Sequence, residues 1–462
     1  LFYFSLIYKG VSFVTYDNTC EILSDDVLNV LADESGFKKR DSKITPKMFL
    51  DNLLFNASSD VNKSLNSLSI EMKQAYGIDV TKQGLHDRFK ESTTLYLKSI
   101  LSKLSFQQVQ SIDEGWMGYF NRVRIKDSTK FVLPEEYAEM MPGFGGVSSK
   151  SATCIQYEYD LKTGSILDLN ITSANRPDSK DARDTQDNIK AGDLVIRDLG
   201  YYSTDVMKHL MDNGAFIISK LNTNTMVYET QDSQYEQIEF DKLFQWFTTH
   251  KIKQIEKQVY IGVESKLPFR LIISLVPEEV FDKRMQKINK YNKRMGYKTS
   301  DAYADRARFN LIITNVVSEI PPEVIMAIYH MRWQIELVFK IWKSTFGIHK
   351  TGQMKYYRWL SILYAKLILI VIYWHKILPL RTHFYKMKGK LLSIDKCFKT
   401  LKVFTVKLRK AIQYGEEKLE SVTGEIQLLI SEKHWLEKRK DKLNYEQIMY
   451  ILFCKSNIYV YI

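Results

Sequence analysis

The sequence predicts a mixed α/β core that is interrupted by a β-rich insertion and flanked by helical N- and C-terminal regions. Changes of pattern along the 462 residues predict this fold class. Apolar residues recur every three or four positions as far as about residue 110, which is the spacing of an amphipathic helix. From about residue 121 the apolar residues alternate with polar ones, as they do in half-buried strands, and the helical spacing returns after about residue 321.

The N-terminal helical region contains a helix-turn-helix pattern. Residues 69–76 read as a helix, Gly77 as the turn and Thr81 as the opening of a second helix, which is the order of that DNA-binding motif. The second helix would carry the polar side chains of Lys82, Gln83, His86, Arg88 and Lys90. A plain helical hairpin fits the pattern equally well, so DNA contact by this helix is one of two interpretations.

The core ahead of the insertion is predicted to contain several strands and one helix. A first strand ends at or near Asp127, and residues 153–160 and 165–172 form a hairpin through Gly164. Residues 193–198 form a short apolar strand that ends in Asp198. Ser203 can cap a following helix, which gives way at Gly214 to a last strand over residues 215–220. This order of elements is typical of a mixed α/β sheet.

The second half of the chain begins with the insertion. Strand-like runs at 258–263 and 267–276, and a very basic helix over about 278–294, read as an insertion with its own strands. The core then returns with a strand at 309–316 and a helix from Pro321 and Pro322 to about Ser344. We therefore divide the chain into a helical N-terminal DNA-binding region (1–112), the first part of the core (113–220), the β-rich insertion (221–305), the second part of the core (306–378) and a basic helical C-terminal region (379–462).

Charge and composition favour a polyanionic partner. The formal net charge is +12 and the pI is near 9.1, which favours nucleic acid first and an anionic membrane second. Residues 385–410 hold nine Lys or Arg against one acid, Asp395. We expect this stretch to contribute to DNA binding or to the pairing of two protomers, although a solvated helix explains it almost as well.

Three features point to a protein of the cytoplasm with no membrane span. The most apolar stretch, residues 359–374, is short for a span and contains Lys366, so we expect a buried core helix. The four cysteines form no CxxC pair, which argues against a zinc site or a disulfide scaffold and for a reducing compartment. The opening residues 1–8 lack a basic region and a cleavage site, and read as a fragment edge rather than a signal peptide.

Three carboxylates are candidate metal ligands. Asp127 and Asp198 each close an apolar strand, plausibly in one sheet, and Glu336 lies on the helix that follows the core's last strand. Strand-end acids are common in loops, so either aspartate alone means little. Together with Glu336 they would make an oxygen-only site for two hard divalent cations, Mg²⁺ with Mn²⁺ as a possible substitute. Such a site suits the cleavage of phosphodiester bonds.

The helix around Glu336 concentrates cations near that acid. At about 100° per residue, one stripe carries the side chains of Tyr329, Arg332, Glu336, Lys340 and Lys343, beside an apolar face that is expected to be buried. A solvated face with an Arg332–Glu336 ion pair would explain the stripe if the helix stood alone. Beside a metal site, Arg332, Lys340 and Lys343 would instead bind phosphates on either side of the bond that is cut.

These motifs resemble the DDE transposases of bacterial insertion sequences, specifically the insertion sequence 4 family. The signature of that family is Tyr, two residues, Arg, three residues, Glu, six residues, Lys, and it matches Tyr329, Arg332, Glu336 and Lys343 with every spacing intact. The family's first acid lies in a strand end like Asp127-Ser128-Thr129. Its second acid lies in Asp-x-Gly-Tyr/Phe, which matches Asp198-Leu199-Gly200-Tyr201. The resemblance covers about residues 120–375.

The resemblance implies an RNase H-like catalytic core with a β-rich insertion between the second Asp and the Glu. It also implies cut-and-paste DNA transposition, with nicking at the element end, a hairpin intermediate and strand transfer. Asp127, Asp198 and Glu336 would be the catalytic metal ligands, and Tyr329, Arg332 and Lys343 would contact the DNA end. Two protomers are expected to form a homodimer in the synaptic complex, and the location is expected to be the nucleoid. Family members often hold a flipped base with an insertion-domain tryptophan, but no motif identifies Trp246 as that residue.

Two other functions stay open at this stage. A nuclease or resolvase on the same fold would use the same metal ligands without strand transfer. A domesticated DNA-binding protein would have lost catalysis, but the intact set of acids argues against that history.

Overall fold

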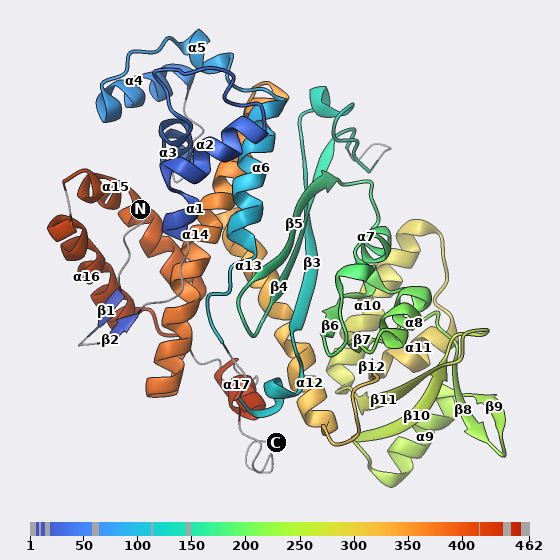
Figure 1. The fold of residues 1–462 in the computed structure, drawn as a ribbon. Coiled ribbons are helices and arrows are strands. Elements are labelled where there is room, and N and C mark those ends of the chain that lie inside the picture. Colours follow the sequence, from blue (N-terminus) through green and yellow to red (C-terminus); the bar gives the residue numbers. More distant parts are fainter. Residues whose placement is uncertain are drawn as a thin grey trace. The chain divides into compact units, whose positions relative to one another are not determined.

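The computed structural model describes residues 6–8, 11–13, 19–57, 64–111, 114–144, 149–414, 416–437 and 445–453 (Figure 1). The chain forms two compact units. One contains Leu1–Ile112, Ser128–Asn175 and Trp333–Gln447, and the other contains Asp113–Asp127, Arg176–Arg332 and Ile448–Ile462. Most of the opening segment that reads as a fragment edge, residues 1–5, lies outside the described residues.

The N-terminal region is helical, as the apolar spacing predicts. After the short strands β1 (Leu6–Tyr8) and β2 (Val11–Phe13), its helices are α1 (Thr19–Ile22), α2 (Asp25–Glu34), α3 (Pro46–Ala57), α4 (Leu65–Tyr76), α5 (Lys82–His86) and α6 (Glu91–Ser105). The turn that was expected between α4 and α5 is present: Gly77 has a φ of 67°, and Thr81 caps α5 through a hydrogen bond from the Gly84 amide. The second helix is shorter than the motif predicts, because it ends at His86 and leaves Arg88 and Lys90 outside it.

Ten strands form one hydrogen-bonded sheet in the order β5-β4-β3-β6-β7-β12-β11-β10-β8-β9. They are β3 (Val123–Val132), β4 (Ala152–Asp160), β5 (Ile166–Ser173), β6 (Leu194–Arg197), β7 (Phe216–Lys220), β8 (Val227–Gln231), β9 (Gln234–Gln237), β10 (Gln254–Ile261), β11 (Leu267–Leu275) and β12 (Phe309–Thr314). Strand β6 pairs in parallel with both β3 and β7, and β12 pairs antiparallel with β7. The predicted mixed α/β sheet is confirmed.

Strand β3 is longer than predicted. It passes through Asp127 and ends only at Val132, so Asp127 lies inside the strand rather than at its end. The polar run Lys126-Asp127-Ser128-Thr129 looks like a loop in the sequence, but residues on both sides of it are held in the sheet. The predicted hairpin is confirmed: β4 and β5 pair antiparallel, and Gly164 in the turn has a φ of 71°.

Short helices connect the strands. They are η1 (Gly115–Tyr119), η2 (Glu135–Tyr137), α7 (Asp178–Asp184), η3 (Gln186–Asn188), η4 (Leu199–Tyr201) and α8 (Thr204–Asp212). Ser203 caps α8 by accepting a hydrogen bond from the Val206 amide, as the sequence predicts.

The strands of the insertion extend the core sheet instead of forming a sheet of their own. β11 pairs with β12 along six residue pairs, and β10, β8 and β9 continue the series outward. The insertion also contains α9 (Phe240–His250), which the sequence analysis did not predict, and α10 (Glu278–Met295) and α11 (Asp301–Ala307). Phe247 of α9 is buried, and its ring lies 5.3 Å from that of Phe309. This packing covers the sheet with one helix face.

The single helix that the sequence predicts up to Ser344 is two helices. α12 (Pro322–Met331) ends one residue before Arg332, and α13 (Trp333–Ser344) begins one residue after it. The division between the two compact units falls at the same residue. The apolar face predicted for α13 is confirmed, since Ile335, Val338 and Trp342 are buried.

The apolar helix expected around residues 359–374 is part of α14 (Tyr356–Lys388), which packs against α3 and α6 (Figure 1). α14 is long and apolar enough to cross a membrane, but its most apolar window is entirely buried within the protein. Lys366 is buried with its ammonium donating to the Gly347 carbonyl at 3.0 Å. α14 is therefore a core helix, as expected.

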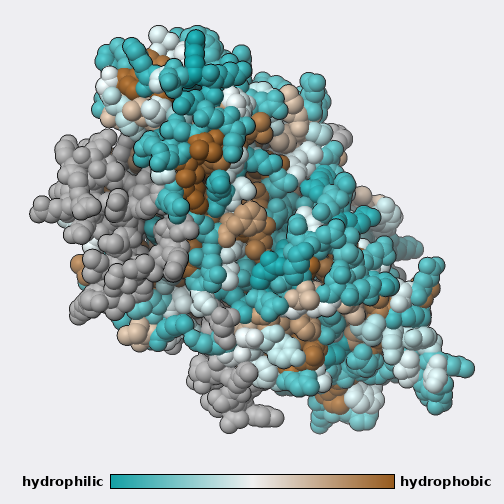
Figure 2. All heavy atoms as spheres, in the orientation of Figure 1, coloured by the Kyte–Doolittle hydropathy of each residue, from teal (hydrophilic) through white to brown (hydrophobic). Residues whose placement is uncertain are grey.

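On the face drawn in Figure 2, hydrophobic residues form patches among hydrophilic ones.

The chain continues with α15 (Ile394–Tyr414), α16 (Glu416–Lys433) and α17 (Tyr445–Phe453). Several cations of the basic stretch have partners within the fold. Lys399 pairs with Asp395 at 2.6 Å, Lys407 pairs with Glu425, and the Lys402 ammonium donates to the Thr345 carbonyl. The side chain of Lys410 lies outside the described residues. These contacts favour a structural role for Lys399, Lys402 and Lys407.

Candidate active site

Two neighbouring parallel strands bring the two predicted aspartates to one edge. In the register of β3 with β6, Val123 pairs with Leu194 and the series ends at Lys126 opposite Arg197. Asp127 and Asp198 are the next residues on their strands. Because parallel strands in register advance together, the two carboxylates follow at the same level of the sheet. Both side chains are only partly buried, so both can be reached by a ligand.

The backbone after β6 leaves the Asp198 carboxylate available. Asp198 is the N-cap of η4 and has extended backbone angles, but its side chain makes no capping hydrogen bond. The turn is closed instead by the main chain, through the Tyr201 amide and the Asp198 carbonyl at 3.0 Å. The Arg197 guanidinium lies 5.8 Å from the centre of the Tyr201 ring and helps to hold this turn.

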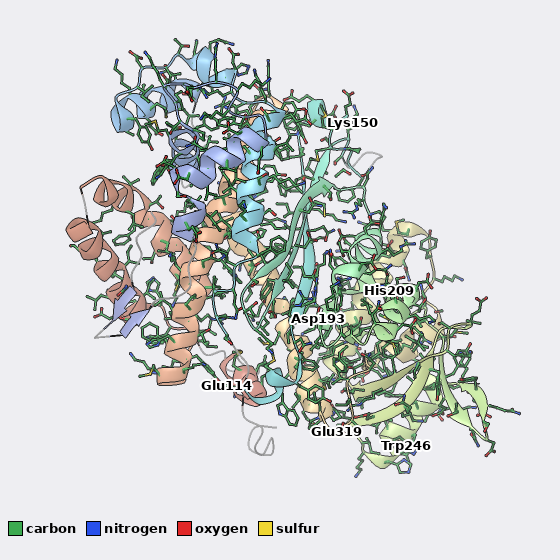
Figure 3. The ribbon with its side chains drawn as sticks, viewed as in Figure 1. Glu114, Lys150, Asp193, His209, Trp246 and Glu319 are labelled. Atoms are coloured by element: carbon green, nitrogen blue, oxygen red, sulfur yellow. The ribbon has the colours of Figure 1, made fainter. Side chains whose placement is uncertain are left out.

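A buried ionic network supports the same edge from the other face of β3. Successive strand residues point to opposite faces, so Arg124 and Lys126 share a face that Asp127 does not. Lys126 is fully buried and lies 2.6 Å from Asp181 of α7, while Arg124 lies 3.4 Å from the buried Asp193. Figure 3 labels Asp193 among the side chains. Arg176 also pairs with Asp181, at 3.1 Å. The sequence analysis missed this network, although charged residues alternating with Val123 and Ile125 are its signal.

Arg332 pairs with the first aspartate. Its Nη1 lies 3.4 Å from Asp127 Oδ2, and the two side chains are 14% and 19% exposed. Arg332 lies between α12, which ends at Met331, and α13, which begins at Trp333. Glu336, in the first turn of α13, accepts a hydrogen bond from the indole Nε1 of Trp333.

The other members of the predicted stripe differ in exposure. Tyr329 is buried in α12, with 7% of its surface exposed, whereas Lys340 is exposed on α13. Lys343 is half-buried, its ammonium lies 3.4 Å from the Lys130 carbonyl, and burial lowers its pKa. Tyr329 is therefore not part of an exposed surface.

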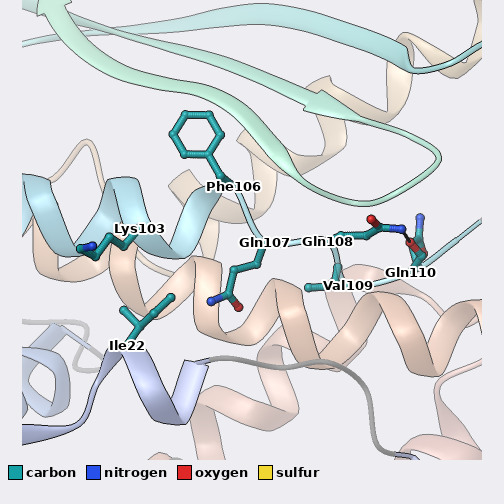
Figure 4. Close-up of a pocket in the computed structure, with 7 residues that line it drawn as sticks. All are labelled: Ile22, Lys103, Phe106, Gln107, Gln108, Val109 and Gln110. Atoms are coloured by element: carbon teal, nitrogen blue, oxygen red, sulfur yellow. Dashed lines mark hydrogen bonds between the residues drawn. The ribbon is translucent and has the colours of Figure 1, made fainter. Parts of the chain in front are cut away.

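The donor set fits a hard divalent cation. The partly exposed carboxylates of Asp127 and Asp198 at one sheet edge supply the oxygen ligands that Mg²⁺ and Mn²⁺ prefer. Within the described part of the chain, no group of three His, Cys, Asp or Glu side chains lies in a geometry that could hold a metal. A 760 Å³ pocket beside α6 is unsuited to the same role, because none of the described residues that line it is an acid (Figure 4). Cys154 and Cys397 are buried and form no disulfide with a described residue.

A mixed sheet that carries aspartates at the same level of two adjacent parallel strands, beside an arginine, suits enzymes that act on phosphodiester bonds with divalent metal ions. Residues 118–358 match the family described as "Transposase DDE domain". This match spans more than half of the chain, and the chain belongs to that family. The predicted family is thus confirmed, and with it the RNase H-like fold, transposase activity and the expectation of DNA as the partner.

Named transposases are similar over most of their length. The transposase for insertion sequence element IS1151 of Clostridium perfringens is 29% identical over 84% of this chain and 86% of its own. The transposase for insertion sequence element IS231C of Bacillus thuringiensis subsp. berliner is 29% identical over 93% of this chain and 94% of its own. The similarity therefore extends into the flanking helical regions, where the sequence motifs gave no resemblance.

Proposed function

We propose that this transposase cleaves DNA at the ends of an insertion sequence and joins those ends to target DNA, in a cut-and-paste reaction. Asp127, Asp198 and Glu336 would be its catalytic residues and would hold two divalent cations, Mg²⁺ or Mn²⁺. The observation that carries the assignment is the parallel register of β3 and β6, which aligns Asp127 with Asp198. Glu336 is assigned to the site by the spacing of the family signature and by its position in the first turn of α13.

The chemistry divides between the metal ions and the side chains. Bound divalent cations would make a water or a sugar hydroxyl more acidic and stabilise the leaving oxygen. The carboxylates hold those cations by charge, and the sheet fixes the two aspartates before DNA arrives. Arg332 neutralises Asp127 in the absence of DNA, because the two lie 3.4 Å apart. Its guanidinium also has the planar geometry that binds a phosphate through two hydrogen bonds.

Residues around Glu336 would bind the DNA end. We assign this role to Arg332, Lys340 and Lys343 on grounds of charge, and to Tyr329 by the family signature. Lys340 is exposed and can reach a phosphate directly. Tyr329 is 7% exposed, so contact with DNA would require its surroundings to rearrange.

The test is incubation of the protein with linear DNA that carries the element's ends. With Mg²⁺ we expect nicks, hairpin ends and joined products, and Asp127→Asn, Asp198→Asn or Glu336→Gln should each abolish all three while DNA binding survives. Asp205→Asn is the matched control, because this exposed acid lies in the first turn of α8 and outside the site. Full cleavage by any one of the three variants would remove that residue from the site.

The products also separate the alternatives. A nuclease or resolvase would yield cut ends without joined products, and a domesticated DNA-binding protein would yield bound, uncut DNA. We propose that two protomers pair on two ends, which sedimentation of the end-bound complex would measure. We also propose that the protein acts in the cytoplasm on the nucleoid, where its DNA substrate lies.

A further inference from the structure

Helix α10 of the insertion is held to the sheet by one face. The Arg284 guanidinium donates to the carbonyls of Ala307 and Phe309, each at 2.9 Å, and to the Asn310 side chain at 2.5 Å. Arg308 lies 4.1 Å from the centre of the Phe281 ring, which belongs to the same face. These contacts fix the rotation of the helix about its own axis.

The face that points away carries a row of cations. Lys283, Lys287, Lys290 and Arg294 follow at spacings of four, three and four residues, and all are exposed. At 100° per residue they fall within an arc of about 60°, roughly opposite the half-buried residues Phe281, Met285, Ile288 and Asn292. We call these four cations the α10 row. Between Lys283 and Arg294 the helix contains six cations and no acid.

The α10 row has no acidic partner within the described part of the chain, whereas some other exposed lysines have one. Lys208 pairs with Asp212 at 2.6 Å and Lys242 with Glu239 at 2.7 Å. Glu279 lies one turn before Lys283, yet no ion pair joins them, and no ion pair is made by the other three cations. Like charges at i,i+4 destabilise a helix by about 0.2–0.5 kcal/mol per pair. The row therefore weakens α10 unless an anion joins it.

A solvated helix face accounts for only part of this pattern. Cations in the last turn stabilise the helix dipole, which explains Arg294. Lys283 lies in the first half of the helix and Lys287 lies near its middle, where the dipole gives no such benefit. A membrane surface is a poorer fit, because Phe281, Met285 and Ile288 are half-buried against the protein, and only Val280, Tyr291 and Met295 of the large apolar side chains of α10 are exposed.

We propose that the α10 row binds the sugar–phosphate backbone of duplex DNA, outside the catalytic site and without reading sequence. The proposal rests on the transposase function described above, since that activity supplies the DNA. From Lys283 to Arg294 the helix advances about 16 Å, which corresponds to roughly five base pairs of duplex. Tyr291, with its ring 5.7 Å from the Arg294 guanidinium, lies beside the row and is 47% exposed.

The test compares two variants with the same change of charge. The first is Lys283→Gln, Lys287→Gln, Lys290→Gln, Arg294→Gln. The matched control is Lys73→Gln, Lys150→Gln, Lys208→Gln, Lys242→Gln, which removes four exposed cations that already have acidic partners. Binding of an end-containing duplex is measured by fluorescence anisotropy over a series of salt concentrations. If all four cations contact phosphates, the slope of log K against log salt should become shallower by about 3.6 for the first variant only.

A second measurement does not depend on that variant folding. A photo-crosslinking amino acid at position 287 should crosslink to duplex DNA, and the same amino acid at position 208 should not. Equal slopes for both variants with no crosslink at 287 would overturn the proposal. Failure of the wild-type protein to cleave ends would instead refute the proposed function, and the binding slopes would still report on the α10 row.

Discussion

Arg332 pairs with Asp127, and this contact affects how the loss of Arg332 should be interpreted. Its contact with Asp127 is made at 3.4 Å between side chains that water still reaches. Exposed ion pairs contribute about 0–1 kcal/mol to stability. Lys126 and Asp181 are the opposite case, because both are almost fully buried. Loss of the Arg332–Asp127 pair should therefore affect DNA binding, whereas loss of the Lys126–Asp181 pair should affect the stability of the fold.

We predict that Arg332→Ala impairs DNA handling and leaves stability nearly unchanged. Binding to precut ends should weaken, and hairpin formation should slow most at high salt, because a phosphate contact is lost. Arg332→Lys should recover only part of the activity, since an ammonium cannot make the two-point contact. Arg183→Ala, which removes an exposed arginine of α7, is the control. A variant that melts several degrees lower and binds ends normally would show that Arg332 is structural.

We predict that Asp181→Ala destabilises the fold more than Lys126→Met. Removing Asp181 leaves the fully buried Lys126 without that partner, and breaking a buried pair costs about 3–5 kcal/mol. Removing Lys126 still leaves Asp181 paired with Arg176 at 3.1 Å. Urea unfolding of the two variants measures the difference. Equal losses of unfolding free energy would contradict this account of the network.

At the scale of elements, α14 dominates one unit and carries a titratable group in its buried part. His375 is 2% exposed, with its Nδ1 lying 3.5 Å from Thr19 Oγ1. Burial lowers its pKa to about 4. At neutral pH the folded protein therefore holds His375 in its neutral form. As the pH falls, the cost of keeping His375 neutral should destabilise the packing of α14 before the carboxylates of the surface titrate.

We predict that stability falls as the pH drops from about 6.5 to about 4, and that His375→Gln reduces this loss. In that window the unfolded chain binds a proton that the folded chain does not, so folding becomes less favourable as pH falls. The contribution of this one group is on the order of 3 kcal/mol at most. Urea midpoints at several pH values measure it. His250→Gln, which changes an exposed histidine, is the control, and the idea fails if both variants follow the wild-type profile.

At the scale of the whole molecule, catalysis and folding should have separate requirements. The described core consists of apolar strand and helix faces, and Asp127 and Asp198 lie at its edge rather than within it. The elements near the aspartates are held by hydrogen bonds and ion pairs between protein groups. Metal binding should therefore be required for DNA cleavage but not for the stability of the fold.

We predict that removing divalent cations abolishes cleavage without unfolding the protein. In a chelator, the melting temperature of the DNA-free protein should stay within a degree or two of its untreated value, because no core contact depends on a metal. Mg²⁺ or Mn²⁺ should restore nicking. A large drop in melting temperature on chelation would mean that the fold itself contains a structural metal site.

The sequence by itself determined the features that local pattern controls. Spacing of apolar residues located most strands and helices, and a capping Ser203 and turn-forming Gly77 and Gly164 marked where elements begin or end. The motif spacing identified the family and selected Asp127, Asp198 and Glu336 as candidate ligands. These features depend on a few neighbouring residues, so they can be found without knowing what lies across the fold.

Only the tertiary structure decided how distant segments pair. It carried β3 past Asp127 and joined the insertion's strands to the core sheet through β12. It also ended α12 at Met331 and paired Arg332 with Asp127. Strand partners and buried ion pairs form between residues far apart in the chain, and their energies depend on burial that no local pattern encodes. For this reason the burial of Arg124 and Lys126 could not be predicted from the sequence.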